Sequence, residues 1–159
     1  MRPRILTLSG AAAAAAALAL PAAAPALVQV DRGLAGARLG NTIAQVQAAL
    51  GRPASVRTGR NEFGRFRQET YGGGISVFYQ GGRTVTSAAT TGPGDRTATG
   101  VGVGSTESAV RRGVRGIRCE TIAGFRSCHT GQFLAGRRIT DFSIRRGKVT
   151  RVTVGFVID

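Results

Sequence analysis

Two stretches, LGNTIAQVQAAL at residues 39–50 and VGSTESAVRRGV at residues 103–114, align without a gap at an offset of 64 positions. The same offset brings the Val-Thr pair at residues 85–86 onto the Val-Thr pair at residues 149–150. A fixed internal period is the sequence signature of a duplicated structural unit. Each half of the chain is therefore expected to begin with the same helix opener and to continue with the same strands.

The first stretch carries the signals of a short helix. Thr42 and Gln45 have the spacing of a capping box, in which the hydroxyl and the amide satisfy free N–H groups of the first turn. Apolar residues recur at helical spacing at positions 43, 46 and 50, and Gly51 with Pro53 is expected to end the helix. The second stretch begins in the same way at Thr106, and Glu107 in its first turn suits the helix dipole.

Alternating apolar residues predict antiparallel strands in both halves. The expected buried faces have a period of two and consist of Ile75, Val77 and Tyr79; of Thr140, Phe142 and Ile144; and of Val152, Val154, Phe156 and Ile158. We therefore expect an α+β fold of two tandem modules, each a short helical segment packed on an antiparallel β-sheet. The modules occupy residues 27–90 and 101–159, and residues 91–100, which have turn composition, form the linker between them.

Residues 1–26 have the layout of a secretory signal peptide. A basic start at residues 1–4 precedes an apolar run at residues 5–20 and a stretch of small residues with an Ala-x-Ala site. We expect cleavage after Ala26, which leaves a secreted, extracytoplasmic chain with no transmembrane segment. A retained membrane anchor is the alternative, and it is less favoured because the run is Ala-rich and shorter than the roughly 20 apolar residues of a span.

The two cysteines, Cys119 and Cys128, fit a disulfide-bonded hairpin. If Ala123 and Gly124 form a two-residue turn, counting outward places the cysteines opposite each other on a non-hydrogen-bonded pair. The Cα atoms of such a pair are roughly 4.5 Å apart, which permits a disulfide. A redox pair or a metal site is less favoured, because the Cys-x-x-Cys spacing and nearby histidine ligands are absent.

Composition favours a binding protein over an enzyme. The chain has 22 Lys and Arg against 8 Asp and Glu, a formal charge of +14, one His and two Cys. It has no nucleophile elbow, zinc-protease motif or phosphate-binding loop, so we expect no catalytic residues, no metal and no cofactor. A further hypothesis, besides binding of a protein or of a polyanion, is an exported enzyme whose active site has no recognisable sequence motif. Nucleic acid is not an expected partner, because an exported chain with few stacking aromatics suits it poorly.

The motif GxTxxxVxxxLGxP at residues 40–53, followed by YxxxIxVxY at residues 71–79, resembles the small outer-membrane assembly lipoprotein module (SmpA/OmlA, BamE-like). Two such modules in tandem, with a short cysteine bridge after the second helix, resemble the secreted β-lactamase inhibitor proteins. The resemblance implies helices on one side of an antiparallel sheet and a role in protein binding without catalysis. The second copy departs from the pattern in lacking the Gly-x-Pro stop.

Two sets of residues are candidates for binding. Phe78 is expected to point outward from the sheet, where an exposed aromatic side chain can hold a protein partner. The second set is the basic residues of the second half, Arg111, Arg112, Arg115, Arg145 and Arg146. They could bind anionic cell-envelope polymers or lipid head groups, or they could form a solvated basic surface that keeps the protein soluble.

Overall fold

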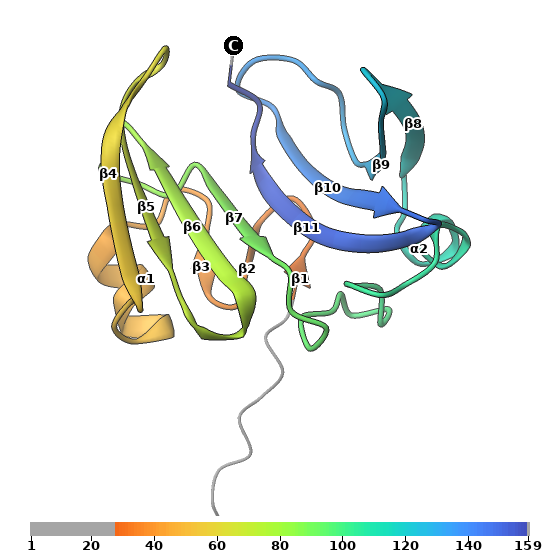
Figure 1. Cartoon of the computed structure of the whole chain (residues 1–159), viewed down its shortest axis with the longest axis horizontal. Coiled ribbons are helices and arrows are strands. Elements are labelled where there is room, and N and C mark those ends of the chain that lie inside the picture. Colours follow the sequence, from red (N-terminus) through yellow and green to blue (C-terminus); the bar gives the residue numbers. More distant parts are fainter. Residues whose placement is uncertain (1–27, 159) are drawn as a thin grey trace, which may run out of the picture.

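The computed structural model describes residues 28–158 (Figure 1). The signal peptide expected at residues 1–26 lies outside the described residues. Three short strands come first: β1 (Val28–Gln29), β2 (Gly33–Leu34) and β3 (Ala37–Arg38). The first half continues with α1 (Ile43–Leu50), β4 (Ser55–Asn61), β5 (Gly64–Thr70), a 3₁₀ turn (Gly72–Gly74), β6 (Ile75–Gln80) and β7 (Ser87–Thr90). The second half contains α2 (Glu107–Gly113), β8 (Arg118–Ile122), β9 (Phe125–His129), β10 (Arg138–Arg145) and β11 (Lys148–Phe156).

The strands of both halves join one antiparallel sheet. Its order is β4-β5-β6-β7-β11-β10-β9-β8, so each half contributes four neighbouring strands and the halves meet where β7 pairs with β11. Strands β1, β2 and β3 form a second, three-stranded sheet. The expected α+β fold is confirmed. The two halves appear in mirrored order along the large sheet, and the last strand of each lies at its centre (Figure 1).

The helix openers make the same contacts in both halves. The amide of Gly40 donates to the carbonyl of Val85 over 2.9 Å, and Gly104 donates to Val149 over 2.8 Å. The hydroxyls of Thr42 and Thr106 cap their helices by accepting from the amide three residues further on. Because both glycines have φ near +85° (85° and 88°), they occupy a conformation that other residues rarely adopt. At the openers, the sequence repeat is therefore also a repeat of backbone geometry.

The expected buried faces of the two halves are found in the core. Tyr79 and Phe142 are fully buried, and their neighbours on the same faces of β6 and β10 are buried with them. The expectation for the last strand was partly wrong, because Phe156 is only half-buried and Ile158 is exposed. Strand β11 ends at Phe156, which pairs with Arg138 at the start of β10. No strand residue lies opposite Ile158 to cover it.

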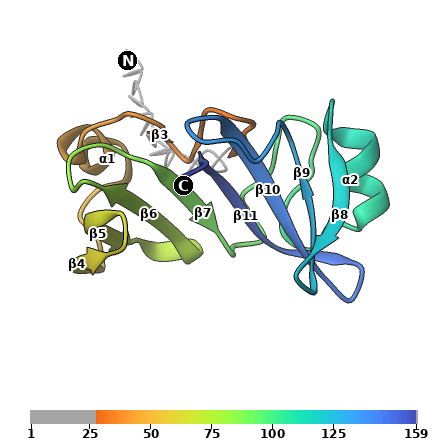
Figure 2. The same cartoon turned by 90° about the horizontal axis from the view of Figure 1, so that it is seen from above.

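The N-terminal segment, residues 28–39, was not anticipated from the sequence. It lies on the same side of the large sheet as α1, over its central strands (Figure 2). Val28, Leu34 and Ala37 are buried in the common core. The segment packs on this side of the sheet, between the two helices, so that the opposite face carries no element of the described chain (Figure 2).

Asp31 fastens this segment to the second half of the chain. Its amide donates to the Thr140 hydroxyl over 2.7 Å, and its carboxylate accepts from the hydroxyls of Thr130 and Thr140. Asp31→Ala leaves two buried hydroxyls without their acceptor, so we expect a loss of about 1–2 kcal/mol in the free energy of unfolding. Urea unfolding measures it, with Asp31→Asn, which keeps an acceptor oxygen, as the milder control. An unchanged midpoint for Asp31→Ala would contradict this role.

Candidate binding surface on the open face of the sheet

The open face is the side of the large sheet that no helix covers (Figure 2). Phe78 lies on it, as expected, because its neighbours Val77 and Tyr79 point into the core. The side chain is half-buried, because its ring stacks on Phe66 of β5 with ring centroids 5.3 Å apart and planes 20° apart. The guanidinium of Arg57 lies over the other ring, 5.7 Å from its centroid. The first half thus presents a stacked aromatic pair capped by a cation.

Gly59 makes room for this aromatic pair. It is the register partner of Phe66, and a Cβ atom at Gly59 would lie 2.8 Å from the Phe66 ring. Any larger residue at this position would push the ring away from the sheet. The pair is therefore held down against the strand and has a defined orientation.

Small side chains form the centre of the open face, where the two halves meet. Ser87 pairs with Gly155 and Ala89 pairs with Thr153. A Cβ atom at Gly155 would lie 2.9 Å from the Ser87 side chain, so the strands approach closely here. Arg151 reaches across the seam toward the hydroxyl of Ser76 on β6, 3.4 Å away. The centre of the open face is consequently depressed, and larger side chains project on either side of it, Phe66 and Phe78 in the first half and Phe125 in the second.

A hollow of about 1140 Å³ occupies the second half of the open face. Its apolar wall contains Phe125, Ile122 and Phe133, which are 72%, 50% and 45% exposed. Asp141, Arg145 and Arg151 supply charges around it. Large apolar side chains that gather in a hollow with this much exposure are typical of a surface that a partner covers. These residues were not among the expected binding residues, although Phe125 is recognisable as an apolar residue directly after a hairpin turn.

The hairpin that carries Phe125 is the one expected from the cysteine spacing. Ile122 pairs with Phe125 and Cys119 with Cys128, as the two-residue turn requires. Ala123 and Gly124 both have positive φ, 49° and 83°, which is the geometry of a type I′ turn. The disulfide between Cys119 and Cys128 is confirmed, with Cα atoms 3.9 Å apart. It fixes the hairpin at the edge of the sheet.

Helix α2 packs against the same hairpin. Glu107 at its start accepts hydrogen bonds from Arg126 of β9 and from Arg111 one turn along the helix. The hydrogen bonds from Arg126 and Arg111 hold the pKa of Glu107 at about 2, well below its ordinary value. The Glu107 carboxylate lies within 4.8 Å of both cysteine sulfurs. Because the disulfide takes up both sulfurs, this group has no thiolate to offer a metal ion.

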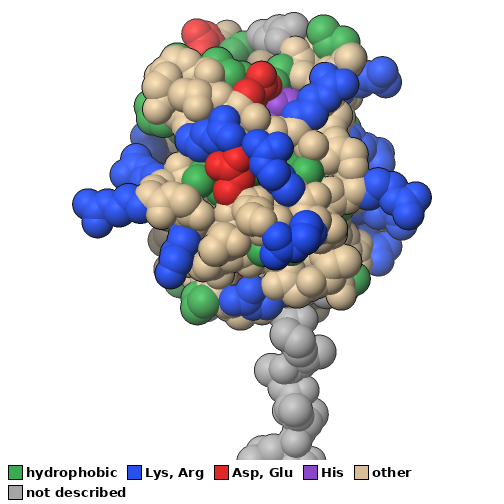
Figure 3. Space-filling view, turned by 90° about the vertical axis from the view of Figure 1, so that its right-hand side faces the viewer, with side chains coloured by type: hydrophobic (Ala, Val, Ile, Leu, Met, Phe, Trp, Pro, Cys, Tyr) green, Lys and Arg blue, Asp and Glu red, His purple; other side chains and the backbone are tan. Residues whose placement is uncertain are grey.

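The structure divides the basic residues that the sequence analysis grouped together. Arg111 is paired with Glu107, and Arg112 donates to the Ser108 hydroxyl. Arg145 lines the hollow on the open face, Arg146 occupies the following turn, and Arg115 lines a groove on the helix side. At the end of the molecule shown in Figure 3, basic groups are spread over the surface and acidic groups lie between some of them. These five arginines therefore do not form one patch.

A buried carboxylate in the first half was also missed. Glu69 on β5 is fully buried and accepts hydrogen bonds from Arg67 (2.7 Å), Gln47 (3.0 Å), Tyr71 (2.7 Å) and Tyr79 (2.9 Å). Burial raises its pKa, but the hydrogen bonds outweigh burial and the pKa of Glu69 is lowered from its ordinary value. Burial and the nearby carboxylate raise the pKa of both tyrosine hydroxyls. Because Gln47 of α1 donates to this buried carboxylate of β5, the cluster ties α1 to the sheet.

Glu69 and Cys128 occupy corresponding places in the two halves. Glu69 pairs with Val56 on one side and Val77 on the other, and Cys128 pairs with Cys119 and Phe142. Each is the core-facing residue of the second strand of its half. A charged hydrogen-bond cluster thus stands in the first half where a covalent bridge stands in the second.

Comparison with known proteins gives similarities of fold. No protein family model matches the chain, and no curated protein matches it. The solved structure of the uncharacterized protein YfeY from Escherichia coli is similar with a TM-score of 0.51 and 18% identity, covering 79% of this chain and 97% of that chain. An extracellular protein containing a SCP domain from Bacillus anthracis has a TM-score of 0.48 and 10% identity, covering 74% of this chain and 44% of that chain. The DUF4309 family protein YjgB from Bacillus subtilis has a TM-score of 0.47 and 18% identity, covering 76% and 82%.

The similarity to YfeY concerns the arrangement of helices and strands, and it brings no activity with it. Within residues 28–158, neither helix has the length and apolar content that a membrane span requires.

Proposed function

We propose that this chain is a secreted, non-enzymatic binding protein that holds a protein partner on the open face of its large sheet. The observation that carries the proposal is the uncovered face, with the stacked pair of Phe66 and Phe78 at one end and the hollow beneath Phe125 at the other. A few residues, often aromatic, supply most of the binding energy of a protein interface, and exposed aromatic side chains beside a hollow can act in this way. A convex or extended segment of the partner would lie across the seam between them.

Three further observations support the proposal. The confirmed disulfide suits export, because such bridges persist in oxidising compartments. The rigid hairpin and the close contact at Gly59 orient the aromatic rings before binding, which lowers the entropy cost of association. The resemblance of each half to the BamE-like module, and of the pair to secreted β-lactamase inhibitor proteins, also supports a role in protein contact.

The experiment uses the purified chain as bait in a pull-down from a culture of the organism that produces it. The bound protein is then identified, and its dissociation constant is measured. Phe125→Ala is expected to weaken binding about 30-fold, the equivalent of about 2 kcal/mol for an aromatic residue that acts as a hot spot. The matched control is Phe63→Ala, because Phe63 is 42% exposed but does not line the hollow. Equal losses for both variants would contradict binding on the open face.

Salt separates this proposal from binding of a polyanion. Contact through aromatic side chains should change little between low and high ionic strength, whereas binding of an anionic polymer should fall steeply. A bound species that salt removes, and that Phe125→Ala still retains, would contradict the proposed function.

A further inference from the structure

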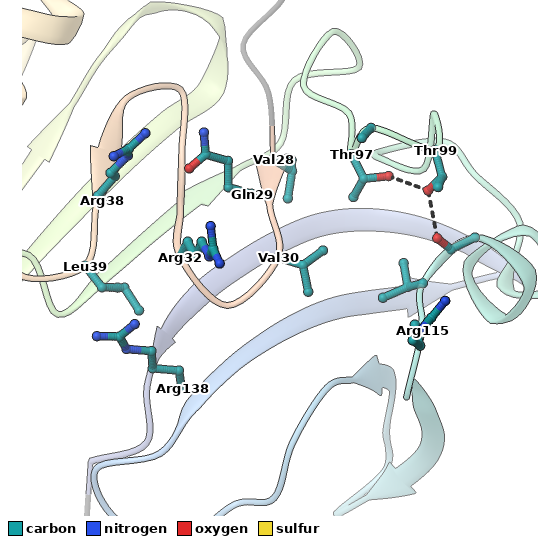
Figure 4. A pocket seen from close by; sticks show the side chains of 13 residues that line it. Val28, Gln29, Val30, Arg32, Arg38, Leu39, Thr97, Thr99, Arg115 and Arg138 are labelled. Atoms are coloured by element: carbon teal, nitrogen blue, oxygen red, sulfur yellow. Dashed lines mark hydrogen bonds between the residues drawn. The ribbon is translucent and has the colours of Figure 1, made fainter.

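A groove of about 900 Å³ lies on the helix side of the sheet, between the N-terminal segment and the end of α2 (Figure 4). We call it the helix-side groove. It is separate from the open face, because Arg138, which lines it, projects from β10 on the same side as the core residue Thr140. Its four charged lining residues are all arginines: Arg32, Arg38, Arg115 and Arg138.

No carboxylate neutralises these arginines. The groove is lined by no Asp or Glu, and none of the four arginines forms an ion pair within the described residues. Asp31, the chain neighbour of Arg32, is instead held by the hydroxyls of Thr130 and Thr140. Guanidinium groups stay protonated at any ordinary pH. The lining of the groove therefore carries four positive charges and no negative one.

The charges are gathered at one end of an apolar floor. Arg32, Arg38 and Arg138 lie around Leu39, whereas Val28 and Val30 lie between them and Arg115 (Figure 4). The Arg138 guanidinium stacks over the Phe156 ring, 5.6 Å from its centroid. Stacking of this kind orients the plane of a guanidinium and leaves its N–H groups at the edge for a carboxylate or phosphate.

We infer that the helix-side groove binds an anionic amphiphile that has one alkyl chain. Its carboxylate or phosphate head accepts hydrogen bonds from Arg32, Arg38 and Arg138, and its alkyl chain lies on Val28 and Val30. Guanidinium groups recognise both heads in the same two-point geometry. The volume falls within the roughly 300–1,000 Å³ of small-molecule sites. This ligand would occupy the side of the sheet opposite the proposed partner surface.

Calorimetric titration with dodecyl phosphate and with laurate, each below its micelle concentration, tests the inference and separates the two head groups. We expect one amphiphile bound per chain and about tenfold or greater weakening in Arg32→Ala/Arg138→Ala. The control is Arg60→Ala/Arg65→Ala, which removes two exposed arginines from the β4–β5 hairpin, outside the groove. Thermal unfolding of both double variants shows that they are folded.

Two further probes test the contributions of the head group and of the alkyl chain separately. Inorganic phosphate supplies the head without the chain, and dodecyl maltoside supplies the chain without the charge, so each should bind more weakly than dodecyl phosphate. Val30→Asp should weaken dodecyl phosphate while leaving all four arginines in place. The inference is overturned if the arginine double variant binds like the unmodified chain, if phosphate alone binds as tightly as dodecyl phosphate, or if amide shifts map the amphiphile to the open face.

Discussion

Replacing Glu69 with alanine is expected to lower the free energy of unfolding by about 3 kcal/mol. Breaking a buried ion pair by removing one partner typically costs about 3–5 kcal/mol. The lower end applies here because Arg67 is 27% exposed and can turn toward water, whereas the hydroxyls of Tyr71 and Tyr79 lose their acceptor inside the core. Urea unfolding followed by circular dichroism measures the change.

The same carboxylate makes stability depend on pH. Because the pKa of Glu69 is lowered in the folded chain, its contribution is fully present above the unfolded value of about 4.3 and is lost as pH falls through the folded value. Stability should therefore decline on acidification, and less steeply in Glu69→Ala. The control is Glu62→Ala, which removes an exposed carboxylate of the β4–β5 turn and should change little. Matching losses in the two variants would contradict the role assigned to the cluster.

Removing the disulfide, as Cys119→Ala/Cys128→Ala, should cost about 2–3 kcal/mol. Closing a ten-residue loop restricts the unfolded chain by this amount in the chain-entropy model. The loss should appear in denaturant unfolding of the double variant, and reduction of the unmodified chain should reproduce it. A non-reducing mass measurement that shows two free thiols in the purified chain would contradict the bridge itself.

The loss of the disulfide should also weaken binding on the open face. Without it, the hairpin that carries Phe125 remains paired with β10 through β9. We therefore expect the double variant to keep its fold at moderate temperature but to bind the captured partner more weakly, because the Phe125 ring is less well oriented.

Local signals predicted the parts of the fold that neighbouring residues decide. Thr42 and Gln45 form the expected capping box, because both contacts lie within one turn of helix. The hairpin register from Cys119 to Cys128 followed from the two-residue turn alone. The alternating faces of β6 and β10 followed from the two-residue period of strands. Each of these inferences needed fewer than a dozen consecutive residues.

What the sequence could not predict depends on residues far apart in the chain. Asp31 accepts a hydrogen bond from Thr140, which lies 109 positions away in the sequence. Because this contact holds the N-terminal segment in place, the residues near Asp31 do not by themselves predict its three short strands. The sequence around Glu69 does not mark it as a buried carboxylate, because Gln47 and Tyr79 approach it only after the sheet has formed. The grouped arginines illustrate the same limit. Adjacency in sequence does not show which side of a sheet each guanidinium reaches, and Arg115 and Arg145 lie on opposite sides.

The correspondence between Glu69 and Cys128 has a consequence for the environments that the molecule withstands. Acidification destabilises the first half, which depends on the carboxylate of Glu69, whereas a thiol reductant destabilises the second half, which depends on the disulfide of Cys128. Acid therefore weakens the Glu69 cluster near α1, and it also weakens the contacts of Glu107 that join α2 to the hairpin. A neutral reducing medium weakens only the end near α2, where the disulfide lies.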